Sequence, residues 1–289
     1  MKSRSRGLAP LLTRVSAWIL CDFLADFMPS SKTPTLPCLA SLGSNIPKLI
    51  YCRYTSILVY LGIYVISSAR YRIIGTGAIN WRIIHTLMNK LFLDIETLPA
   101  DKDKHELLRE IHRKKTEDGK KVRDFEDFVA QTTFDGAFGR IACVSFAINN
   151  EPPQSLFGDE KQILEKFWEA AKNIDIFIGF NIMDFDLRFI YQRSIVLGVK
   201  PTKELIFARY RNNPIYDVMR EWVKWNMQTF ITLDVLAKAL GTPSSKGGEV
   251  EGKNVAKAFE MGKIKEICEY CEKDVEVTRK IYYKMTFED

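Results

Sequence analysis

The sequence predicts an α/β fold with a mixed central sheet over residues 88–289, and two observations support this prediction. Apolar runs of strand length come first and lie close together, an arrangement that favours a hairpin meander. A later run of the same kind is followed by segments whose apolar residues recur every three or four positions, which is the period of a helix. Strands that begin as a meander and then alternate with helices are typical of a mixed sheet.

The strands are predicted from runs of apolar and β-branched residues. The first covers residues 90–98 and the second covers residues 139–148. A turn at residues 149–153 leads into a short third strand at residues 154–157, which completes the meander. A fourth strand is expected at residues 174–180, where the run Ile-Asp-Ile-Phe-Ile-Gly-Phe has the length and composition of a buried strand.

The helices are predicted from the 3.6-residue apolar period and from Gly and Pro stops. Residues 101–128 are highly charged, and we expect one or two exposed helices there, around a Lys/Asp/Gly turn at residues 117–121. Gly198 ends one later helix, and Gly241 with Pro243 ends another. The later helices are expected at residues 159–172, 185–197, 216–225, 233–240, 254–261 and 264–284.

Residues 1–87 differ in composition from the rest of the chain. They hold ten Lys and Arg residues but only two acids, Asp22 and Asp26, and they show no clear amphipathic period. Three interpretations of this segment are open: a signal anchor or marginal membrane span, a targeting presequence, or an extension from a start site assigned upstream of Met88. Residues 54–69 are mostly apolar, but such a run is shorter than the roughly 20 residues that span a bilayer.

We favour the third interpretation for the N-terminal segment. It predicts that residues 1–87 are a poorly ordered extension and that residues 88–289 are the folded domain. No stable membrane association is expected. The six cysteines show no regular spacing, which favours a reducing compartment and hence a cytoplasmic location.

The basic charge of the chain belongs to its first 87 residues. The whole chain has a net charge of +6, residues 1–87 contribute +8 (10 − 2), and residues 88–289 therefore contribute −2. A domain this close to neutral does not attract a polyanion through a general basic field. Any nucleic acid that it binds must be held locally and through metal.

Asp94 and Glu96 stand at the end of the first predicted strand, after the apolar run Leu-Phe-Leu. Residues i and i+2 of a strand point to the same face, so both carboxylates project together. Neighbouring acids repel each other and lose hydration when buried, unless a cation compensates. Mg²⁺ or Mn²⁺ suits such oxygen ligands. An isolated Asp-x-Glu more often marks a strand end that reaches solvent, so the metal interpretation needs further acids.

Two later segments supply such acids. The fourth predicted strand exits through Asn181 into a helix, and Asp184 and Asp186 stand at this turn, at the sheet edge where ligands collect. An Asp before a helix is also a common N-cap, so a capping role competes with metal binding. Further on, Tyr270 and Asp274 share one helix face, which an apolar stripe turns toward the body of the protein. A buried Asp needs a partner, and a metal cluster is one.

These motifs, in this order, resemble the exonuclease motifs of the DEDD superfamily. They are Asp-Ile-Glu at residues 94–96, Asn-Ile-Met-Asp-Phe-Asp at residues 181–186, and Tyr-Cys-Glu-Lys-Asp at residues 270–274. The Tyr of the last motif is typical of the DEDDy branch. Over residues 88–285 the sequence is most similar to the PolB-like predicted 3′–5′ exonucleases, relatives of the proofreading domain of family B DNA polymerases. Residues 134–141 and 232–237 also resemble that family.

The resemblance implies an RNase H-like fold and a two-metal site. Asp94, Glu96, Asp186 and Asp274 would hold two Mg²⁺ or Mn²⁺ ions, roughly 3.5–4 Å apart. Tyr270 would lie beside them. With an ordinary pKa near 10, a Tyr is a poor general base, so Tyr270 is expected to orient the attacking water.

The resemblance also implies the substrate. It would be the 3′ end of a single strand, with DNA favoured over RNA, and the product would be a nucleoside 5′-monophosphate. The second motif of the polymerases, Asn-x-x-x-Phe-Asp, selects Asp186 over Asp184. The residues expected to contact substrate are Thr97, Leu98, Asn181 and Phe185, with fixing of the turn as the alternative for Asn181 and core packing as the alternative for Phe185. Because we find no polymerase domain in the sequence, a polymerase or repair partner would act in trans. The alternative is a non-catalytic nucleic-acid-binding module on the same fold.

Several other polar residues favour structural roles. Asp217 precedes an apolar helix and is expected to cap it, with a place in the cleft as the alternative. Cys268 and Cys271 lie on a predicted helix and are expected near a packed face rather than in a zinc or redox site. Lys246 is expected on a solvated loop.

Overall fold

The computed structural model divides the chain into two compact units, Met1–Ile79 and Asn80–Asp289. The structure describes residues 56–60, 63–67, 72–76, 88–247 and 250–288.

The described part of the first unit is a three-stranded antiparallel sheet in the order β1-β2-β3. The strands are β1 (Ser56–Tyr60), β2 (Ile63–Ser67) and β3 (Arg72–Thr76), and they are rich in the Ile, Val and Tyr that favour strands. We did not predict them, because an unbroken apolar run does not distinguish a strand from a helix. No helix within the described ranges is long and apolar enough to cross a membrane. Most of the predicted poorly ordered extension lies outside the described residues.

The second unit is built on a five-stranded sheet in the order β6-β5-β4-β7-β8. Its central strand β4 pairs antiparallel with β5 and parallel with β7. At the two edges, β6 is antiparallel to β5 and β8 is parallel to β7. The mixed α/β sheet predicted from the sequence is therefore confirmed. The strands are β4 (Lys90–Leu98), β5 (Arg140–Ile148), β6 (Gln154–Phe157), β7 (Ile176–Gly179) and β8 (Ile215–Asp217).

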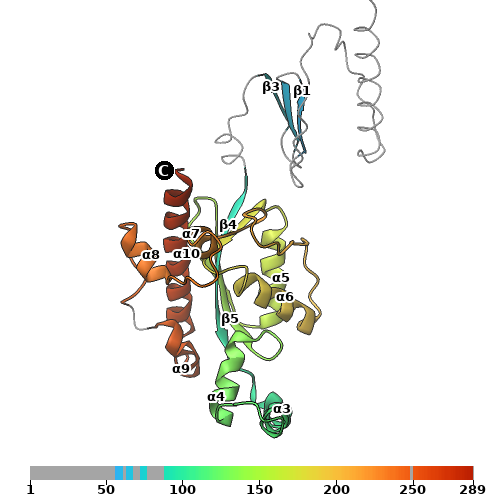
Figure 1. Cartoon of the computed structure of the whole chain (residues 1–289), viewed down its shortest axis with the longest axis vertical. Coiled ribbons are helices and arrows are strands. Elements are labelled where there is room, and N and C mark those ends of the chain that lie inside the picture. Colours follow the sequence, from blue (N-terminus) through green and yellow to red (C-terminus); the bar gives the residue numbers. More distant parts are fainter. Residues whose placement is uncertain (1–55, 61–62, 68–71, 77–87, 248–249, 289) are drawn as a thin grey trace, which may run out of the picture. The chain divides into compact units, whose positions relative to one another are not determined.

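Helices cover both faces of this sheet (Figure 1). One face packs against α5 and α6, and the other packs against α10, with α8 and α9 beside it. The α-helices are α3 (His105–Glu117), α4 (Phe125–Ala130), α5 (Glu160–Ala171), α6 (Asp186–Leu197), α7 (Val218–Trp222), α8 (Leu233–Ala239), α9 (Val255–Glu260) and α10 (Ile264–Thr286). The described residues of this unit also form the short 3-10 helices η1 (Lys102–Lys104), η2 (Gln131–Phe134) and η3 (Gly252–Asn254).

The side chains of β4 alternate between two cores, as expected for a central strand. Leu93 and Ile95 pack with α5 and α6. Phe92 packs on the opposite face with residues of α10, and Leu98 packs there with residues of α9 and α10. Asp94 and Glu96 alternate in step with Phe92 and Leu98, at every second residue of β4. Their side chains therefore lie on the same face of the strand and point toward α10.

Local sequence sets several helix ends, and the predicted end of α6 at Gly198 is confirmed. The side chain of Asp159 accepts a hydrogen bond from the backbone N–H of Gln162 at the start of α5. Gly198, with a φ of 67°, ends α6 in the left-handed conformation that glycine adopts without strain. Thr232 caps α8 through the backbone N–H of Val235. These caps fix where each helix meets the sheet.

A helical arm, residues 102–134, is inserted between β4 and β5 and contains α3 and α4 (Figure 1). The two helices of the arm contact each other through rings and charged side chains, such as His112 on Phe128 at 5.2 Å between ring centroids. At the root of the arm, the backbone N–H of Ala100 donates to Thr132 Oγ1 at 2.8 Å. The arm therefore leaves the sheet and returns to it at neighbouring points.

One sequence prediction is wrong in the second unit. Residues 216–225 were predicted to form a single helix, but the structure has the strand β8 followed by the short helix α7. A strand of three residues is too short to show an alternating pattern. Its pairing with β7, with Ile178 opposite Tyr216, is a contact between distant segments that no local period reveals.

Candidate functional site

Three carboxylates gather where β4 meets α10. Ligand oxygens of Asp94, Glu96 and Asp274 all lie within 4.8 Å of one another. Asp94 projects from the middle of β4, Glu96 projects from its C-terminal half, and Asp274 projects from the middle of α10. Asp274 is buried and the other two are half-buried. We call these three residues the acid cluster.

Asp186 lies beside the acid cluster, as the first residue of α6. It is 3% exposed, and its Oδ1 accepts a hydrogen bond of 3.1 Å from the backbone N–H of Ile95. Ile95 lies between the two acids of β4, and the charge of Asp186 raises the pKa of both Asp94 and Glu96. The structure thus brings all four predicted metal ligands to the C-terminal half of β4, with three in one group and Asp186 next to them.

Burial and mutual repulsion favour protonation of these acids. Burial raises the pKa of Asp94 well above its ordinary value, and the charges of the other three acids raise it further. Burial, followed by the charges of Asp274 and Asp186, raises the pKa of Glu96 to about 8. Burial raises the pKa of Asp186 to about 7, although backbone N–H groups oppose the change. A divalent cation among these oxygens would offset both the repulsion and the lost hydration.

Tyr270 and two loop residues surround Asp274. Burial raises the pKa of Asp274, whereas hydrogen bonds from Ser245 and Tyr270 and the charge of Lys246 lower it. Burial and the nearby acids raise the pKa of Tyr270 well above its ordinary value, so its hydroxyl stays protonated and can donate. Lys246 is exposed on its loop, as predicted, whereas the contact of Ser245 with Asp274 was not predicted. The return of that loop to α10 is a long-range contact that no local pattern indicates.

Cys271 lies against the acid cluster, with its Sγ 3.1 Å from Asp94 Oδ2. Burial raises the pKa of this thiol, so it stays neutral and donates to the carboxylate. Cys143 and Cys268 are also buried and free. The prediction that Cys268 and Cys271 pack in the interior is confirmed, since both belong to the core between β4 and α10.

Asp184, the rival of Asp186, forms an ion pair instead. Its Oδ2 accepts hydrogen bonds from Nε and Nη2 of Arg220 at 3.1 and 2.5 Å. Arg220 is only 5% exposed, whereas the side chain of Asp184 is 33% exposed, so the guanidinium is shielded from solvent and the carboxylate is only partly shielded. The geometry therefore favours Asp186, rather than Asp184, as the acid that accompanies the cluster.

Asp217 is a structural residue that caps α7 and also binds the backbone of a second segment. The predicted cap is confirmed, because Oδ1 accepts the backbone N–H of Arg220 at 3.0 Å. Oδ1 also accepts the N–H of Asn181 at 3.2 Å, and Oδ2 accepts the N–H of Met183 at 3.1 Å. Asp217 thereby fixes the turn that precedes Asp186. Only the fold, which places β8 beside β7, reveals this second role.

The residues predicted to bind substrate lie close to the acids, and most also serve in packing. Thr97 donates from Oγ1 to the carbonyl of Thr133 at 2.8 Å, and Leu98 is 3% exposed in the core. Asn181 holds the turn through its backbone, with a φ of 60°. Phe185 is half-buried directly before Asp186. Their contact with substrate stays a prediction.

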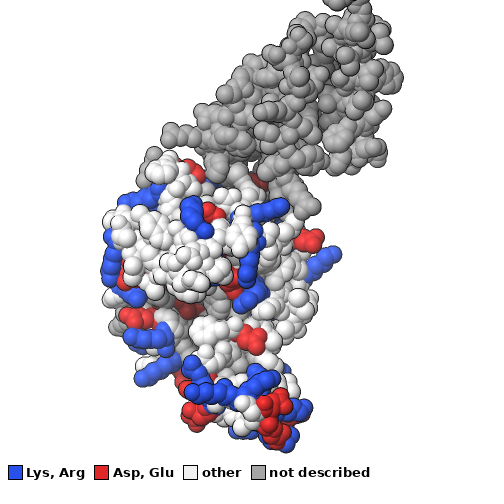
Figure 2. Space-filling view, viewed as in Figure 1, with Lys and Arg blue, Asp and Glu red and all other residues white. Residues whose placement is uncertain are grey.

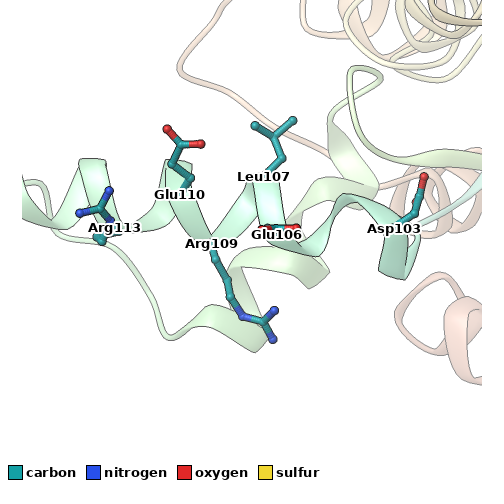
Figure 3. Close-up of a pocket in the computed structure, with 6 residues that line it drawn as sticks. All are labelled: Asp103, Glu106, Leu107, Arg109, Glu110 and Arg113. Carbon is teal, nitrogen blue, oxygen red and sulfur yellow. The ribbon is translucent and has the colours of Figure 1, made fainter.

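A surface pocket lies apart from these residues, along α3 of the helical arm (Figure 3). Its lining is charged except for one leucine, and it contains none of the predicted site residues. The lining residues are Asp103, Glu106, Leu107, Arg109, Glu110 and Arg113.

The chain is similar to a solved family B DNA polymerase from the hyperthermophilic archaeon Pyrobaculum calidifontis. The two are 14% identical with a TM-score of 0.49, and the match covers 78% of this chain and 26% of the polymerase. The chain thus matches about a quarter of that polymerase's length. The search of curated proteins found no match.

A family model provides the decisive comparison. Residues 137–288, more than half of the chain, match the model described as a predicted 3′–5′ exonuclease related to the exonuclease domain of PolB. The matched range contains Asp186, Tyr270 and Asp274, and it starts after the two acids of β4. The family resemblance and the RNase H-like fold predicted from the sequence are confirmed. The chain belongs to the family of predicted 3′–5′ exonucleases related to the exonuclease domain of PolB.

Proposed function

We propose that the protein is a metal-dependent 3′–5′ exonuclease that releases nucleoside 5′-monophosphates from single-stranded nucleic acid, with DNA favoured. The observation that carries the proposal is the acid cluster, in which carboxylate oxygens of Asp94, Glu96 and Asp274 lie within 4.8 Å of one another. Asp186 beside them completes a set of four acids. The family to which the chain belongs supports the direction and the reaction class.

The donor set fits divalent metal ions. All four groups are carboxylates, the hard oxygen ligands that Mg²⁺ and Mn²⁺ prefer. Their pKa values are raised, to about 8 for Glu96. The groups of the protein itself therefore do not fully compensate the negative charge of this site. We assign Asp94, Glu96, Asp186 and Asp274 as the ligands of two ions. When bound, such ions supply a water of lowered pKa and stabilise charge on the leaving 3′ oxygen.

The remaining residues orient this site. Tyr270 hydrogen-bonds to Asp274, and its hydroxyl stays protonated, so it serves as a donor that orients the attacking water rather than as a base. Cys271 restrains Asp94 through a 3.1 Å contact. Asp217 fixes the turn that carries Asp186.

The substrate is held locally rather than by a long-range field. Lys and Arg are intermixed with Asp and Glu on the visible face of the second unit, as Figure 2 shows. Such a surface offers little general attraction for a polyanion. A single-stranded end suits the proposed activity, because its bases need no unpairing before they enter a cleft. We propose that a polymerase or repair partner presents that end in trans, and that the protein acts in the cytoplasm.

Digestion of 5′-labelled single-stranded DNA and RNA tests the proposal. Wild type with Mg²⁺ or Mn²⁺ should shorten the strand from its 3′ end and release 5′-mononucleotides, and EDTA should stop the reaction. Asp94→Ala and Asp274→Ala should be inactive while still folded, as judged by circular dichroism. Equal release by wild type and Asp94→Ala would assign the activity to a contaminant. Binding of the strand without any release would favour the alternative, a non-catalytic binding module.

A further inference from the structure

Positive charge is concentrated at the far end of the helical arm. Residues 113–123, which we call the arm tip, hold six basic residues and two acids, so their net charge is +4 (6 − 2). All six basic side chains are exposed. They are Arg113, Lys114, Lys115, Lys120, Lys121 and Arg123. Since residues 88–289 carry −2 in total, the rest of the domain carries −6 (−2 − 4). The domain therefore combines a positive tip with a negative body.

A run of charges on an exposed helix is often a solvated face whose charges pair with one another. The first part of the arm tip fits this description. Arg113 pairs with Glu117 at 3.2 Å, and Lys114 pairs with Glu110 at 2.6 Å. These pairs stabilise α3, and they need no partner outside the protein.

The second part of the arm tip lacks this compensation. Lys120 has Asp118 at 3.7 Å, at the long end of the range for an ion pair. Within the part of the chain that the structure describes, Lys121 and Arg123 form no ion pair. Cations that lie close together repel one another, and a negatively charged partner would relieve that repulsion.

The packing of α3 on α4 holds the two sides of the arm tip together. Nε2 of His112 donates to the backbone carbonyl of Arg123 at 2.8 Å, and the same ring lies 5.2 Å from that of Phe128. Nζ of Lys115 lies 5.0 Å from the centroid of Phe128. The chain after the turn is thereby fixed to the end of α3, so the cations of both segments form one surface.

The arm tip is about one length of α3 away from the root of the arm. The root is tied to the strand of the acid cluster, because Thr97 Oγ1 donates to the carbonyl of Thr133 at 2.8 Å. The 13 residues of α3 span about 20 Å at roughly 1.5 Å per residue. Figure 3 shows Asp103 and Arg113 at opposite ends of this stretch. Phosphates of one stacked strand lie about 3.4 Å apart, so this length corresponds to about six nucleotides.

We propose that the arm tip binds the phosphate backbone of the substrate strand, about six nucleotides from the 3′ end at the acids. This inference rests on the proposed function and deepens it. The negative body of the domain repels a polyanion, and a positive surface on the arm can hold the strand without entering the site. Every nucleotide carries the same phosphate, so the arm tip favours longer strands over short ones without regard to sequence. Residues 113–123 lie outside the range that matches the family model.

The test crosses a change of charge with a change of strand length. Lys121→Gln/Arg123→Gln neutralises the two cations without an ion pair, and Lys121→Glu/Arg123→Glu reverses them. The control, Lys161→Gln/Lys166→Gln, neutralises two exposed cations of α5, on the sheet face opposite α10. The substrates are a 5′-labelled trinucleotide and a 5′-labelled strand of about 20 nucleotides, more than three times the proposed spacing.

Two quantities would be measured for each protein. The first is kcat/KM with Mg²⁺ for both strands. The second is Kd of the long strand, by fluorescence anisotropy with Ca²⁺ between about 50 and 200 mM KCl, because the salt dependence of Kd reports the number of phosphate contacts. Thermal unfolding of each variant would show that the fold is intact.

Lys121→Gln/Arg123→Gln should raise Kd of the long strand roughly 2- to 30-fold, the range for two exposed ion pairs, and the reversal should raise it further. The slope of log Kd against log salt should fall by about 1.4, since each phosphate contact on a single strand contributes about 0.7. The ratio of kcat/KM for the long strand to kcat/KM for the trinucleotide should fall in the same order. The control should match wild type in all three quantities.

An unchanged Kd of the long strand in both tip variants would overturn the proposal. An equal loss in the control would also overturn it, because the effect would then follow from total charge. Equal losses of kcat/KM for the two strands would overturn it as well, because a trinucleotide is too short to reach the arm tip. If no protein releases nucleotides, the proposed function fails, but Kd and its salt dependence, compared with the control, still decide the role of the arm tip.

Discussion

Buried carboxylates occur in two neighbouring regions of this protein, and their surroundings differ. Asp217 is fully buried, and its two oxygens accept three backbone N–H groups, from Asn181, Met183 and Arg220. In the acid cluster, Asp94 accepts a hydrogen bond from Cys271, and Asp274 accepts hydrogen bonds from Ser245 and Tyr270.

The surroundings of each carboxylate indicate whether it serves the fold or the proposed metal site. A carboxylate that accepts several N–H bonds is satisfied by the protein itself. A group of acids that raise one another's pKa carries a cost in the folded state that only an added cation or protons relieve. Removing a charge from the acid cluster should therefore raise the stability of the metal-free protein, whereas removing Asp217 should lower it. Added metal should stabilise the cluster but should not replace Asp217.

Neutralising one cluster acid should have the largest effect on activity. Asp94→Asn and Asp274→Asn should lower kcat by at least about 100-fold, the loss that follows removal of one electrostatic contributor to a transition state. The same changes should raise the melting temperature of the EDTA-treated protein, because they remove repulsion. Nuclease assays and thermal unfolding of each variant would measure both effects. If either variant melted at a lower temperature than wild type in EDTA, the hydrogen bonds of the protein would already compensate the charges of the cluster.

Asp217→Ala should act in the opposite direction on stability. It leaves three N–H groups without their acceptor, two of them buried, and at roughly 1–3 kcal/mol for each buried unsatisfied group we expect a loss of about 2 kcal/mol or more in unfolding free energy. Urea denaturation would measure the loss. Added Mg²⁺ should not restore it, and Asp217→Asn, which keeps one acceptor oxygen, should lose less. A variant as stable as wild type would remove the distinction between the two regions.

The pH dependence of the metal-free protein should reveal the cluster. Glu96, with a folded pKa of about 8 against an ordinary value of 4.5, binds more protons when folded than when unfolded. Stability should therefore fall as pH rises from about 4.5 to about 8, and Mn²⁺ should stabilise the protein more at pH 8 than at pH 5.5. Differential scanning calorimetry with EDTA or Mn²⁺ would measure this. Glu96→Gln should flatten the dependence, and a melting temperature that rises over this range would contradict the assignment.

The smallest effect is expected at Tyr270. Tyr270→Phe removes one hydrogen bond to Asp274 and should lower kcat by about 2- to 12-fold, the equivalent of roughly 0.5–1.5 kcal/mol. Metal affinity, measured by calorimetric titration with Mn²⁺, should stay within about twofold of wild type. Phe287→Ala provides a matched aromatic change away from the site, because Phe287 is 80% exposed and lies 13 residues (287 − 274) beyond Asp274 along the chain. A loss as large as that of Asp274→Asn would make Tyr270 essential rather than orienting.

The candidate site was largely predictable because its signals are local. The period of two in β4 places Asp94 and Glu96 on one face, and the period of 3.6 in α10 places Asp274 one turn from Tyr270. The strand β4 was predicted with the observed bounds, 90–98. Asp186 needed the family resemblance to separate it from Asp184.

What the sequence did not reveal depends on contacts between distant segments. β8 is recognisable as a strand only through its pairing with β7. Ser245 reaches Asp274 from a loop whose path is set by packing. The second role of Asp217, at the turn of Asn181 and Met183, joins residues more than 30 positions apart. No window of a few residues contains these relations.

The bond between Ala100 and Thr132 makes the helical arm a separable module. It closes the arm at its root, where Asp101 also pairs with Arg140 of β5. Loop-closure entropy changes slowly with length, by about 0.6 kcal/mol for each doubling. Evolution or an engineer can therefore lengthen, shorten or exchange α3 and α4 at little cost to folding. We expect changes in the arm to alter the specificity of the protein while the four acids stay unchanged.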